Sequence, residues 1–389
     1  MDFFKKIIEK TVFISEEQAT AQQECSLYGR YFKDTGIFNV FPTELESTGD
    51  FLGKVLARGS QPNRSKLCGV IIDNGIEFFS YGKKIKCERY SLYQNIFSRN
   101  KGILESDVMS KKKAIILGCG SVGSLVAMEL ARAGVKHFLL CDADIVEYHN
   151  ICRHQCGLED VGDLKVNALM RKIKNINPQA EVISFEGIVQ NLPKVTLDAF
   201  CVAGDTIFVG CADNRIADVY TNRISIFYGA AFLSIGFWER AYAGEIFYHL
   251  PGRNMPCYEC ALGDGGDISA RAQANHHIYS NEEHTEGLKF EPGISVDINF
   301  ITCIGVKLIL DILNANNEDY TPRLLNNLQQ YTIVCNTSDP KIGGEMVEIF
   351  SYPLQVTTSL KVCFNSHCVD QCKYEKQIND AQKGGDSHD

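Results

Sequence analysis

The chain has 389 residues, of which 45% are apolar and 22% charged, and its net charge at neutral pH is −9. This composition is typical of a folded globular protein and excludes a disordered, collagen-like or coiled-coil chain. The length favours one large domain or two unequal ones. The negative charge disfavours a general attraction to nucleic acid or to anionic lipid.

The least charged stretch, residues 224–238, is too short for a membrane-spanning helix, which needs about 20 apolar residues, and we predict a buried strand there. The opening Met1–Lys6 lacks the apolar run and the cleavage site of a secretory signal. We therefore predict no membrane contact and a cytoplasmic location. Most of the 16 cysteines stand singly in apolar runs, where a reduced thiol behaves as a small hydrophobic group.

Residues 1–88 are predicted to form a small, mixed α+β accessory domain that recruits a substrate or partner. Within it, two β-prone runs in 70–79 flank Asn74-Gly75, which favours a hairpin because both residues tolerate positive φ. This part of the chain contains no chemical motif that we recognise.

Residues 89–389 are predicted to form an α/β domain. An apolar strand at 114–117, a glycine turn, a helix that stops near Gly134 and a strand at 137–141 follow one another, and a helix at 164–175 and strands near 182 and 209 continue the alternation. This order predicts a Rossmann-like, mostly parallel sheet with helices on both faces. A helix near 294–313 and added antiparallel strands near 332, 347 and 356 complete the domain, and 383–389 is predicted to be a frayed tail.

The turn between the first strand and helix of this domain carries Gly118, Gly120 and Gly123, and Asp142 ends the next strand. In such a fingerprint the glycines let the backbone approach phosphate, the helix N-terminus supplies N–H groups, and the carboxylate binds ribose hydroxyls. A purely structural turn would not account for Asp142. The pattern therefore predicts a nucleotide site.

The residues after Asp142 favour transfer chemistry over redox chemistry. Asp144, Asn150, Arg153 and Lys165 follow at the phosphate end of the predicted site. Two cations and a carboxamide have little use in hydride transfer, whereas they stabilise the charge of a pentavalent phosphate. The pattern favours phosphoryl or nucleotidyl transfer.

Several motifs share one chain order: Phe97–Asn100, Gly118–Gly123, Asp142–Asp144, Asn150–His154, Gly162–Lys165, Cys211–Asn214 and Cys257–Cys260. With them, residues from about 90 to 372 resemble the ThiF/HesA/MoeB superfamily, the adenylating enzymes related to ubiquitin-activating enzyme. The resemblance implies an enzyme that uses ATP to adenylate the C-terminal carboxylate of a small β-grasp protein or of a peptide, giving an acyl adenylate and pyrophosphate.

The resemblance also implies roles for individual residues. Asp142 resembles the ribose ligand, and Asp144 belongs to the same nucleotide site. Asn150, Arg153 and Lys165 resemble the groups that contact the phosphates. Asp213 resembles the Mg²⁺ carboxylate. Arg99 resembles the arginine that reaches the partner subunit's ATP in a homodimer.

Simpler interpretations remain for these residues. Arg153 could pair with Glu147 or Asp160, Lys165 could be an exposed helix lysine, and Asp213-Asn214 could cap a helix that starts near Arg215. Arg89 competes with Arg99 as the arginine upstream of the glycine turn. We interpret His149 and His154 as orienting or packing residues rather than catalysts.

Two groups of cysteines predict a structural zinc site. Cys257 and Cys260 form a C-x-x-C pair, and Cys368 and Cys372 are our choice for the other two ligands. The family usually shows C-x-x-C in the second pair too, so the spacing here leaves Cys363 and His367 as competing ligands. Four protein ligands would leave no open position for chemistry.

Residues 262–293 are polar and too long for an ordinary connection. By resemblance they form the crossover loop over the acceptor's tail. In thioester-forming relatives this region often carries a catalytic cysteine, but residues 261–302 contain none and Cys303 is predicted to lie in the core. We therefore expect adenylation and leave thioester formation open.

The leading prediction is an ATP-dependent adenylyltransferase for a ubiquitin-like or sulfur-carrier-like protein ending in glycine. The enzyme is expected to work as a homodimer, and a conjugating enzyme is a further candidate partner. A peptide-modifying adenylase or a tRNA-base dehydratase would keep the chemistry and change the substrate. A non-catalytic scaffold in a heterodimer and an NAD-dependent oxidoreductase are the remaining alternatives.

Overall fold

The computed structural model describes residues 9–92, 94–212, 214–262, 292–358, 360–365 and 368. The chain divides into two units, Met1–Gly102 with Lys174–Gln179 and Ile103–Ile173 with Ala180–Asp389. The predicted tail and nearly all of the predicted crossover loop lie outside the described residues. Within the described ranges, no helix has the length and apolar character needed to cross a membrane.

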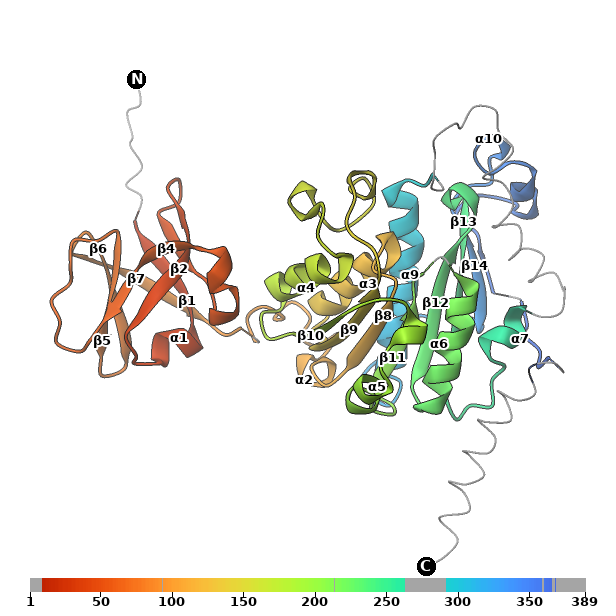
Figure 1. Cartoon of the computed structure of the whole chain (residues 1–389), viewed down its shortest axis with the longest axis horizontal. Helices are drawn as coiled ribbons and strands as arrows, with labels where there is room; N and C mark the ends of the chain where they lie inside the picture. The colour runs from red at the N-terminus through yellow and green to blue at the C-terminus, as the bar shows by residue number, and fades with distance from the viewer. Residues whose placement is uncertain are drawn as a thin grey trace, which may run out of the picture. The chain divides into compact units, whose positions relative to one another are not determined.

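Seven strands close a β-barrel in the first unit (Figure 1). β1 pairs in parallel with both β3 and β7, and this closes the sheet. Val12, Phe38, Leu67 and Phe78 are fully buried among the barrel's apolar side chains. The elements are β1 Thr11–Ser15, α1 Glu16–Thr20, β2 Cys25–Phe32, β3 Ile37–Val40, η1 Thr43–Thr48, β4 Asp50–Leu56, β5 Leu67–Ile72, β6 Gly75–Ser80 and β7 Lys83–Tyr90. The helices are short, so this unit is built mainly of strands.

The hairpin predicted around Asn74-Gly75 is formed by β5 and β6. Ile72 pairs with Gly75, so the two turn residues are Asp73 and Asn74, one position earlier than predicted. Gly75 has φ +132°, and a Cβ there would lie 2.5 Å from a guanidinium nitrogen of Arg89. The positive φ therefore favours glycine at the first position of β6.

The second unit contains an eight-stranded mixed sheet in the order β10-β9-β8-β11-β12-β13-β14-β15. The first five strands of this order are parallel, and β13, β14 and β15 join antiparallel. This confirms the predicted α/β fold and its added antiparallel strands. The strands are β8 Lys113–Leu117, β9 His137–Asp142, β10 Glu181–Glu186, β11 Thr206–Gly210, β12 Ala231–Phe237, β13 Ala243–His249, β14 Tyr331–Cys335 and β15 Val356–Thr357.

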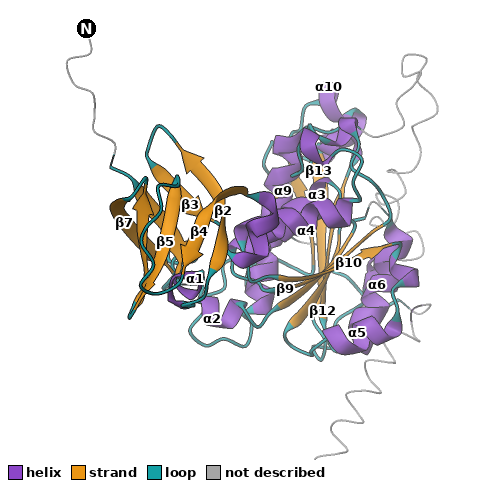
Figure 2. Ribbon diagram, turned by 60° about the vertical axis from the view of Figure 1, so that its left-hand side comes forward, coloured by secondary structure: helices purple, strands orange, loops and turns teal. Residues whose placement is uncertain are grey.

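Helices cover both faces of this sheet. Helices α3, α4 and α9 lie on one face and α5 and α6 on the other (Figure 2), and α3 contacts α9 directly. All five residues of β11 are buried, as expected for a central strand between two helical layers. The helices are α2 Ser106–Met109, α3 Ser121–Arg132, α4 Lys165–Ile176, α5 Lys194–Phe200, α6 Arg215–Phe227, α7 Tyr258–Leu262, α9 Ser295–Leu313 and α10 Pro340–Gly343, and the short 3₁₀ turns are η2 Tyr148–Asn150, η3 Leu158–Asp160, η4 Val189–Asn191, η5 Glu239–Ala241 and η6 Glu345–Ile349.

Two strand predictions need correction. Residues 224–238 do not form one strand, because α6 runs to Phe227 and Gly229, with φ +59°, turns the chain into β12. The strand predicted near Val347 is instead the 3₁₀ turn η6. Val347 and Phe350 are buried three residues apart, which matches the three-residue period of such a turn.

Candidate active site

A cavity of about 660 Å³ lies where four parallel strands end. Its lining includes residues that end or follow β8, β9, β11 and β12. The chain proceeds from β8 to β9 on one side and later crosses to β11 on the other side of β8. Open α/β sheets bind ligands at such a switch point, beyond the carboxyl ends of the strands.

The three glycines of the turn after β8 have different functions. Gly118 has φ +91°, and a Cβ on it would lie 2.6 Å from the Ala212 nitrogen, while a Cβ on Gly123 would lie 1.8 Å from the Gly118 oxygen. A Cβ on Gly120 would meet no atom within 4 Å. Gly118 and Gly123 thus permit tight backbone packing, and Gly120 lines the cavity with open space beside it. No side chain caps the N-terminus of α3 at Gly120, which leaves the amides of its first turn available to an anion.

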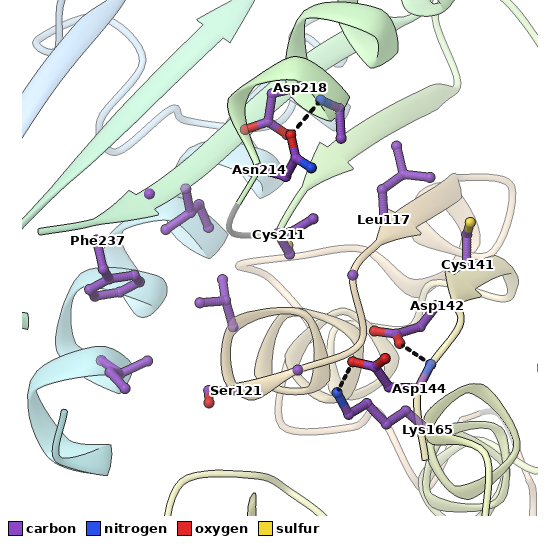
Figure 3. Close-up of a pocket in the computed structure, with 18 of the residues that line it drawn as sticks. Leu117, Ser121, Cys141, Asp142, Asp144, Lys165, Cys211, Asn214, Asp218 and Phe237 are labelled. Atoms are coloured by element: carbon purple, nitrogen blue, oxygen red, sulfur yellow. Dashed lines mark hydrogen bonds and ion pairs between the residues drawn. The ribbon is translucent and has the colours of Figure 1, made fainter. Parts of the chain in front are cut away.

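Asp142 is held by backbone amides at the edge of the cavity. Its Oδ2 accepts a hydrogen bond of 2.6 Å from the Cys119 amide, and its Oδ1 accepts one of 2.8 Å from the Asp144 amide. Both bonds fix the orientation of the carboxylate before any ligand arrives. Figure 3 shows Asp142, Asp144 and Lys165 grouped on one side of the cavity and Phe237 on the other.

Lys165 opens α4 and points into the same group. Its Nζ lies 2.7 Å from Asp144 Oδ2, and only 11% of its side chain is exposed, against 70% for Asp144. The interpretation of Lys165 as an exposed helix lysine is therefore wrong. Because the pair is partly open to solvent, an entering phosphate can share the ammonium group with Asp144.

Asn150 and Arg153 also line the cavity. The side-chain oxygen Oδ1 of Asn150 accepts a hydrogen bond of 2.9 Å from the Glu147 amide, so the side-chain NH₂ group is the part that can donate to an anion. The nearest Arg153 nitrogen would be 3.8 Å from a Cβ on Gly293, which also lines the cavity. Arg153 therefore reaches the side of the cavity that Pro292 and Gly293 line.

His154 supports the glycine turn from behind. Its Nε2 lies 2.7 Å from the Cys119 carbonyl, and its Nδ1 accepts a 3.0 Å hydrogen bond from the Cys156 amide. This pattern assigns a neutral ring with the proton on Nε2, and burial lowers the pKa of His154 from its ordinary value. These contacts agree with an orienting residue, as the sequence predicts.

Seven of the predicted site residues therefore line one cavity: Gly118, Gly120, Asp142, Asp144, Asn150, Arg153 and Lys165. Asp213 lies outside the described residues, although Ala212 and Asn214 on either side of it line the cavity. Asn214 caps α6 by accepting from the Ile216 and Ala217 amides, which confirms the predicted helix start. Arg99 is exposed and belongs to the first unit, and its role stays a prediction.

Sequence reasoning missed one side of the cavity, which we call the β12 wall: Gly236, Phe237, Trp238, Glu239 and Ala241. Trp238 is the single tryptophan of the chain and is 3% exposed. Its position just after an apolar run was the available signal. A residue that ends a parallel strand near the glycine turn belongs to the ligand edge of the sheet.

The buried cysteines Cys257, Cys260 and Cys368 lie together, with sulfur atoms within 4.8 Å of one another. Cys257 Sγ is 3.7 Å from Cys260 Sγ and 2.8 Å from Cys368 Sγ. Zinc–sulfur bonds of about 2.3 Å in a tetrahedron place sulfurs roughly 3.8 Å apart. The Cys257–Cys260 distance fits such a site. The Cys257–Cys368 distance is shorter, so the three thiols fit a metal once Cys368 Sγ moves slightly away from Cys257 Sγ. Of the other candidate ligands, Cys363 is exposed, and Cys372 and His367 lie outside the described residues.

Cys303 does not lie in the core, contrary to the prediction. It is exposed on α9, in line with the exposed residues Phe300 and Lys307. Positions three and four residues apart share one face of a helix, so these residues form the outward stripe of an otherwise apolar helix.

The family model described as "ThiF family" matches residues 94–342, which is more than half of the chain. Ubiquitin-like modifier-activating enzyme 5 of Dictyostelium discoideum is 31% identical over 159 residues, which cover 38% of this chain and 40% of that protein. The tRNA threonylcarbamoyladenosine dehydratase of Bacillus subtilis (strain 168) is 38% identical over 94 residues, covering 23% and 37%. The chain thus spans about two fifths of the length of these curated relatives.

Among solved structures, E. coli MccB with ATP is similar over 71% of this chain and 74% of that one, with 18% identity and a TM-score of 0.49.

Proposed function

The chain belongs to the ThiF family, and from this premise we propose that it is an ATP-dependent adenylyltransferase for the C-terminal carboxylate of a ubiquitin-like or sulfur-carrier-like protein. Its products are an acyl adenylate and pyrophosphate. The observation that carries the proposal is that one cavity is lined by Gly120, Asp142, Asn150, Arg153 and Lys165.

We assign the ribose hydroxyls of ATP to Asp142, and the two amides that orient its carboxylate at the end of β9 support this assignment. The phosphates then lie over Gly120 and the first turn of α3, within reach of Arg153 and Lys165. Nicotinamide chemistry would need no such pair of cations beside the phosphates.

In the proposed reaction the acceptor carboxylate attacks the α-phosphorus, and the bond to the oxygen that leaves with pyrophosphate breaks. A carboxylate is ionised at neutral pH, so no general base is required. The task of the protein is to hold two anions together, which calls for preorganised cations. We assign this role to Arg153 and Lys165, which line the cavity.

Two parts of the proposal rest on the family resemblance. Asp213 is the proposed Mg²⁺ ligand, and the metal would neutralise charge on the phosphates. Arg99 is proposed to reach the partner subunit's ATP in a homodimer.

We also propose that the cysteine cluster holds a structural zinc ion, with Cys372 as the fourth ligand. The cluster joins α7 to the segment that contains Cys368. A closed four-cysteine site would stabilise this join and take no part in adenylation.

Activation of a tRNA base is the second candidate, favoured by the identity to the Bacillus subtilis dehydratase over 94 residues. The net charge of −9 weighs against a polyanionic substrate. The ATP site and the activation step would be shared, so the two candidates differ in acceptor alone.

The first test is binding of Mg·ATP to wild type and Lys165→Ala by calorimetry. Loss of a charge-assisted hydrogen bond costs about 1.5–3 kcal/mol, so we expect roughly ten- to hundredfold weaker binding. Lys194→Ala is the matched control, because Lys194 forms a 2.7 Å pair with Asp198 on α5 and does not line the cavity. Equal affinity of both variants for Mg·ATP, or preferential binding of NAD by wild type, would contradict the proposal.

ATP–pyrophosphate exchange then identifies the acceptor. Exchange that depends on a small protein ending in glycine supports the leading proposal, and exchange that depends on a peptide or on tRNA favours the alternatives. ATP binding without exchange for any acceptor would favour a non-catalytic partner.

A further inference from the structure

The β12 wall lies on the side of the cavity opposite the proposed ribose ligand. The strand order is β9-β8-β11-β12, and adjacent strands are roughly 4.8 Å apart, so the end of β12 lies roughly 14 Å across the sheet from Asp142 at the end of β9. If adenosine binds at β9, as in the proposed function on which this inference rests, the acceptor carboxylate arrives from the β12 side.

Trp238 is the largest side chain of the β12 wall. Its ring packs edge-on against Tyr242, with centroids 5.7 Å apart, and lies 5.9 Å from Phe350. Arg240 and Ala241, which follow it, have φ values of +50° and +54°, a conformation that non-glycine residues rarely adopt. The Asn336 side chain donates a 2.7 Å hydrogen bond to the Ala241 carbonyl and so helps to hold this turn.

A buried carboxylate lies directly behind the wall. Glu245 on β13 is 4% exposed and pairs across the sheet with Gly236. Its Oε2 accepts a hydrogen bond of 3.1 Å from Trp238 Nε1 and one of 2.5 Å from the Tyr331 hydroxyl, and its Oε1 lies 2.7 Å from the Arg215 guanidinium.

The sequence makes room for this arrangement at Gly236. A Cβ there would approach the Glu245 Cγ at 3.1 Å, tighter than ordinary packing allows. Burial raises the pKa of the Tyr331 hydroxyl, which therefore keeps the proton that it donates. Among the described residues, the cavity lining includes Trp238 and does not include Glu245.

We propose that Glu245 is a positioning residue: its hydrogen bond to Trp238 sets the wall against which the last residues of the acceptor bind. Arg215, 2.7 Å from the Glu245 carboxylate, supplies an opposite charge to this buried group. Glu245 itself touches neither nucleotide nor acceptor. Its loss should therefore weaken binding on the acceptor side and leave the nucleotide side unchanged.

The experiment compares two probes by calorimetry: AMP, and 5′-O-(N-glycylsulfamoyl)adenosine, a stable analogue of an acyl adenylate that extends from the nucleotide into the acceptor side. For Glu245→Gln we expect about tenfold weaker binding of the analogue and less than about threefold change for AMP. Because Trp238 is the single tryptophan, the emission of the free variant should also shift, reporting the altered hydrogen bond directly.

Trp238→Phe keeps the Arg215–Glu245 pair and removes the indole N–H. It therefore tests the Trp238–Glu245 hydrogen bond if Glu245→Gln fails to fold. It should show the same separation between the two probes. The matched control is Tyr320→Phe, which removes a 2.7 Å hydrogen bond to the buried carboxylate of Asp311 away from the cavity lining. It should bind both probes as wild type does.

Equal weakening of AMP and analogue, or unchanged analogue binding in both Glu245→Gln and Trp238→Phe, would overturn the inference while leaving the proposed function intact. If wild type binds neither AMP nor the analogue, the proposed function fails, and the inference fails with it.

Discussion

The polar side chains around the cavity are held by partners from the protein itself. Two amides fix Asp142, Asp144 holds Lys165, and the Cys119 carbonyl and Cys156 amide hold His154. Such contacts orient each group before a ligand binds, so little reorganisation is needed during the reaction. At the scale of single residues, this arrangement supports the proposed nucleotide site.

His154 leads to a prediction about pH. Because burial lowers its pKa in the folded state, the unfolded chain takes up the proton first as pH falls below about 6.5. The stability present above pH 6.5 is therefore lost as pH falls towards the folded-state pKa, by at most about 1.4 kcal/mol per pH unit.

Denaturant unfolding of wild type and His154→Gln between pH 7.5 and 5.5 measures this slope. The variant should show a smaller slope, though not zero, because burial also lowers the pKa of His137. An identical slope in both proteins would show that His154 is not buried as the neutral form.

At the scale of elements, the turn from β8 into α3 combines two tasks. Gly118 and Gly123 allow backbone segments to approach one another, and Gly120 leaves open space in the cavity. The sequence motif alone does not separate these tasks, since all three positions are glycine. The separation follows from what surrounds each Cα.

Alanine at two of these glycines should therefore affect different properties, namely stability at Gly123 and Mg·ATP binding at Gly120. Gly123→Ala places a Cβ 1.8 Å from a backbone oxygen, so we expect a loss of stability of at least about 1–3 kcal/mol. Gly120→Ala meets nothing within 4 Å and should fold normally but bind Mg·ATP more weakly. Urea unfolding and calorimetry measure the two effects, and a stable Gly123→Ala or full ATP affinity in Gly120→Ala would contradict the assignment.

At the scale of the whole molecule, the cysteine cluster joins parts of the chain that are distant in sequence. Cys257 and Cys260 flank the start of α7, and Cys368 comes from the segment after β15. A metal there would close a long loop and so stabilise the contact between Cys368 and α7.

If the cluster binds zinc, the purified protein should contain one zinc ion per chain, and chelation should lower Tm by roughly 2–4 °C for each kcal/mol lost. Cys260→Ser should lose the metal, while Cys335→Ser, which changes another buried thiol, should keep it. Metal analysis and thermal unfolding measure these outcomes. Wild-type protein without metal, or equal metal in Cys260→Ser, would refute the zinc site.

Predictability differed between the two sides of the cavity. The glycine turn, Asp142 and Lys165 were found because each lies a short, fixed distance in sequence from a predicted strand or helix. The β12 wall was missed because the last turn of α6 and β12 were merged into one predicted strand over 224–238, and because β13, which carries Glu245, was not predicted at all. Cys303 was misplaced because an apolar helix does not reveal which of its stripes faces outward.

The sequence by itself determined the alternation of strands and helices from β8 to β10 and the residues of the glycine fingerprint, because both depend on spacing between near neighbours in the chain. Tertiary structure alone decided that β12 forms the opposite wall, that Glu245 lies behind Trp238, and that Cys368 rather than the exposed Cys363 lies beside Cys257. These contacts join residues from different strands or distant segments, and their partners are chosen by packing in three dimensions, which no local pattern encodes.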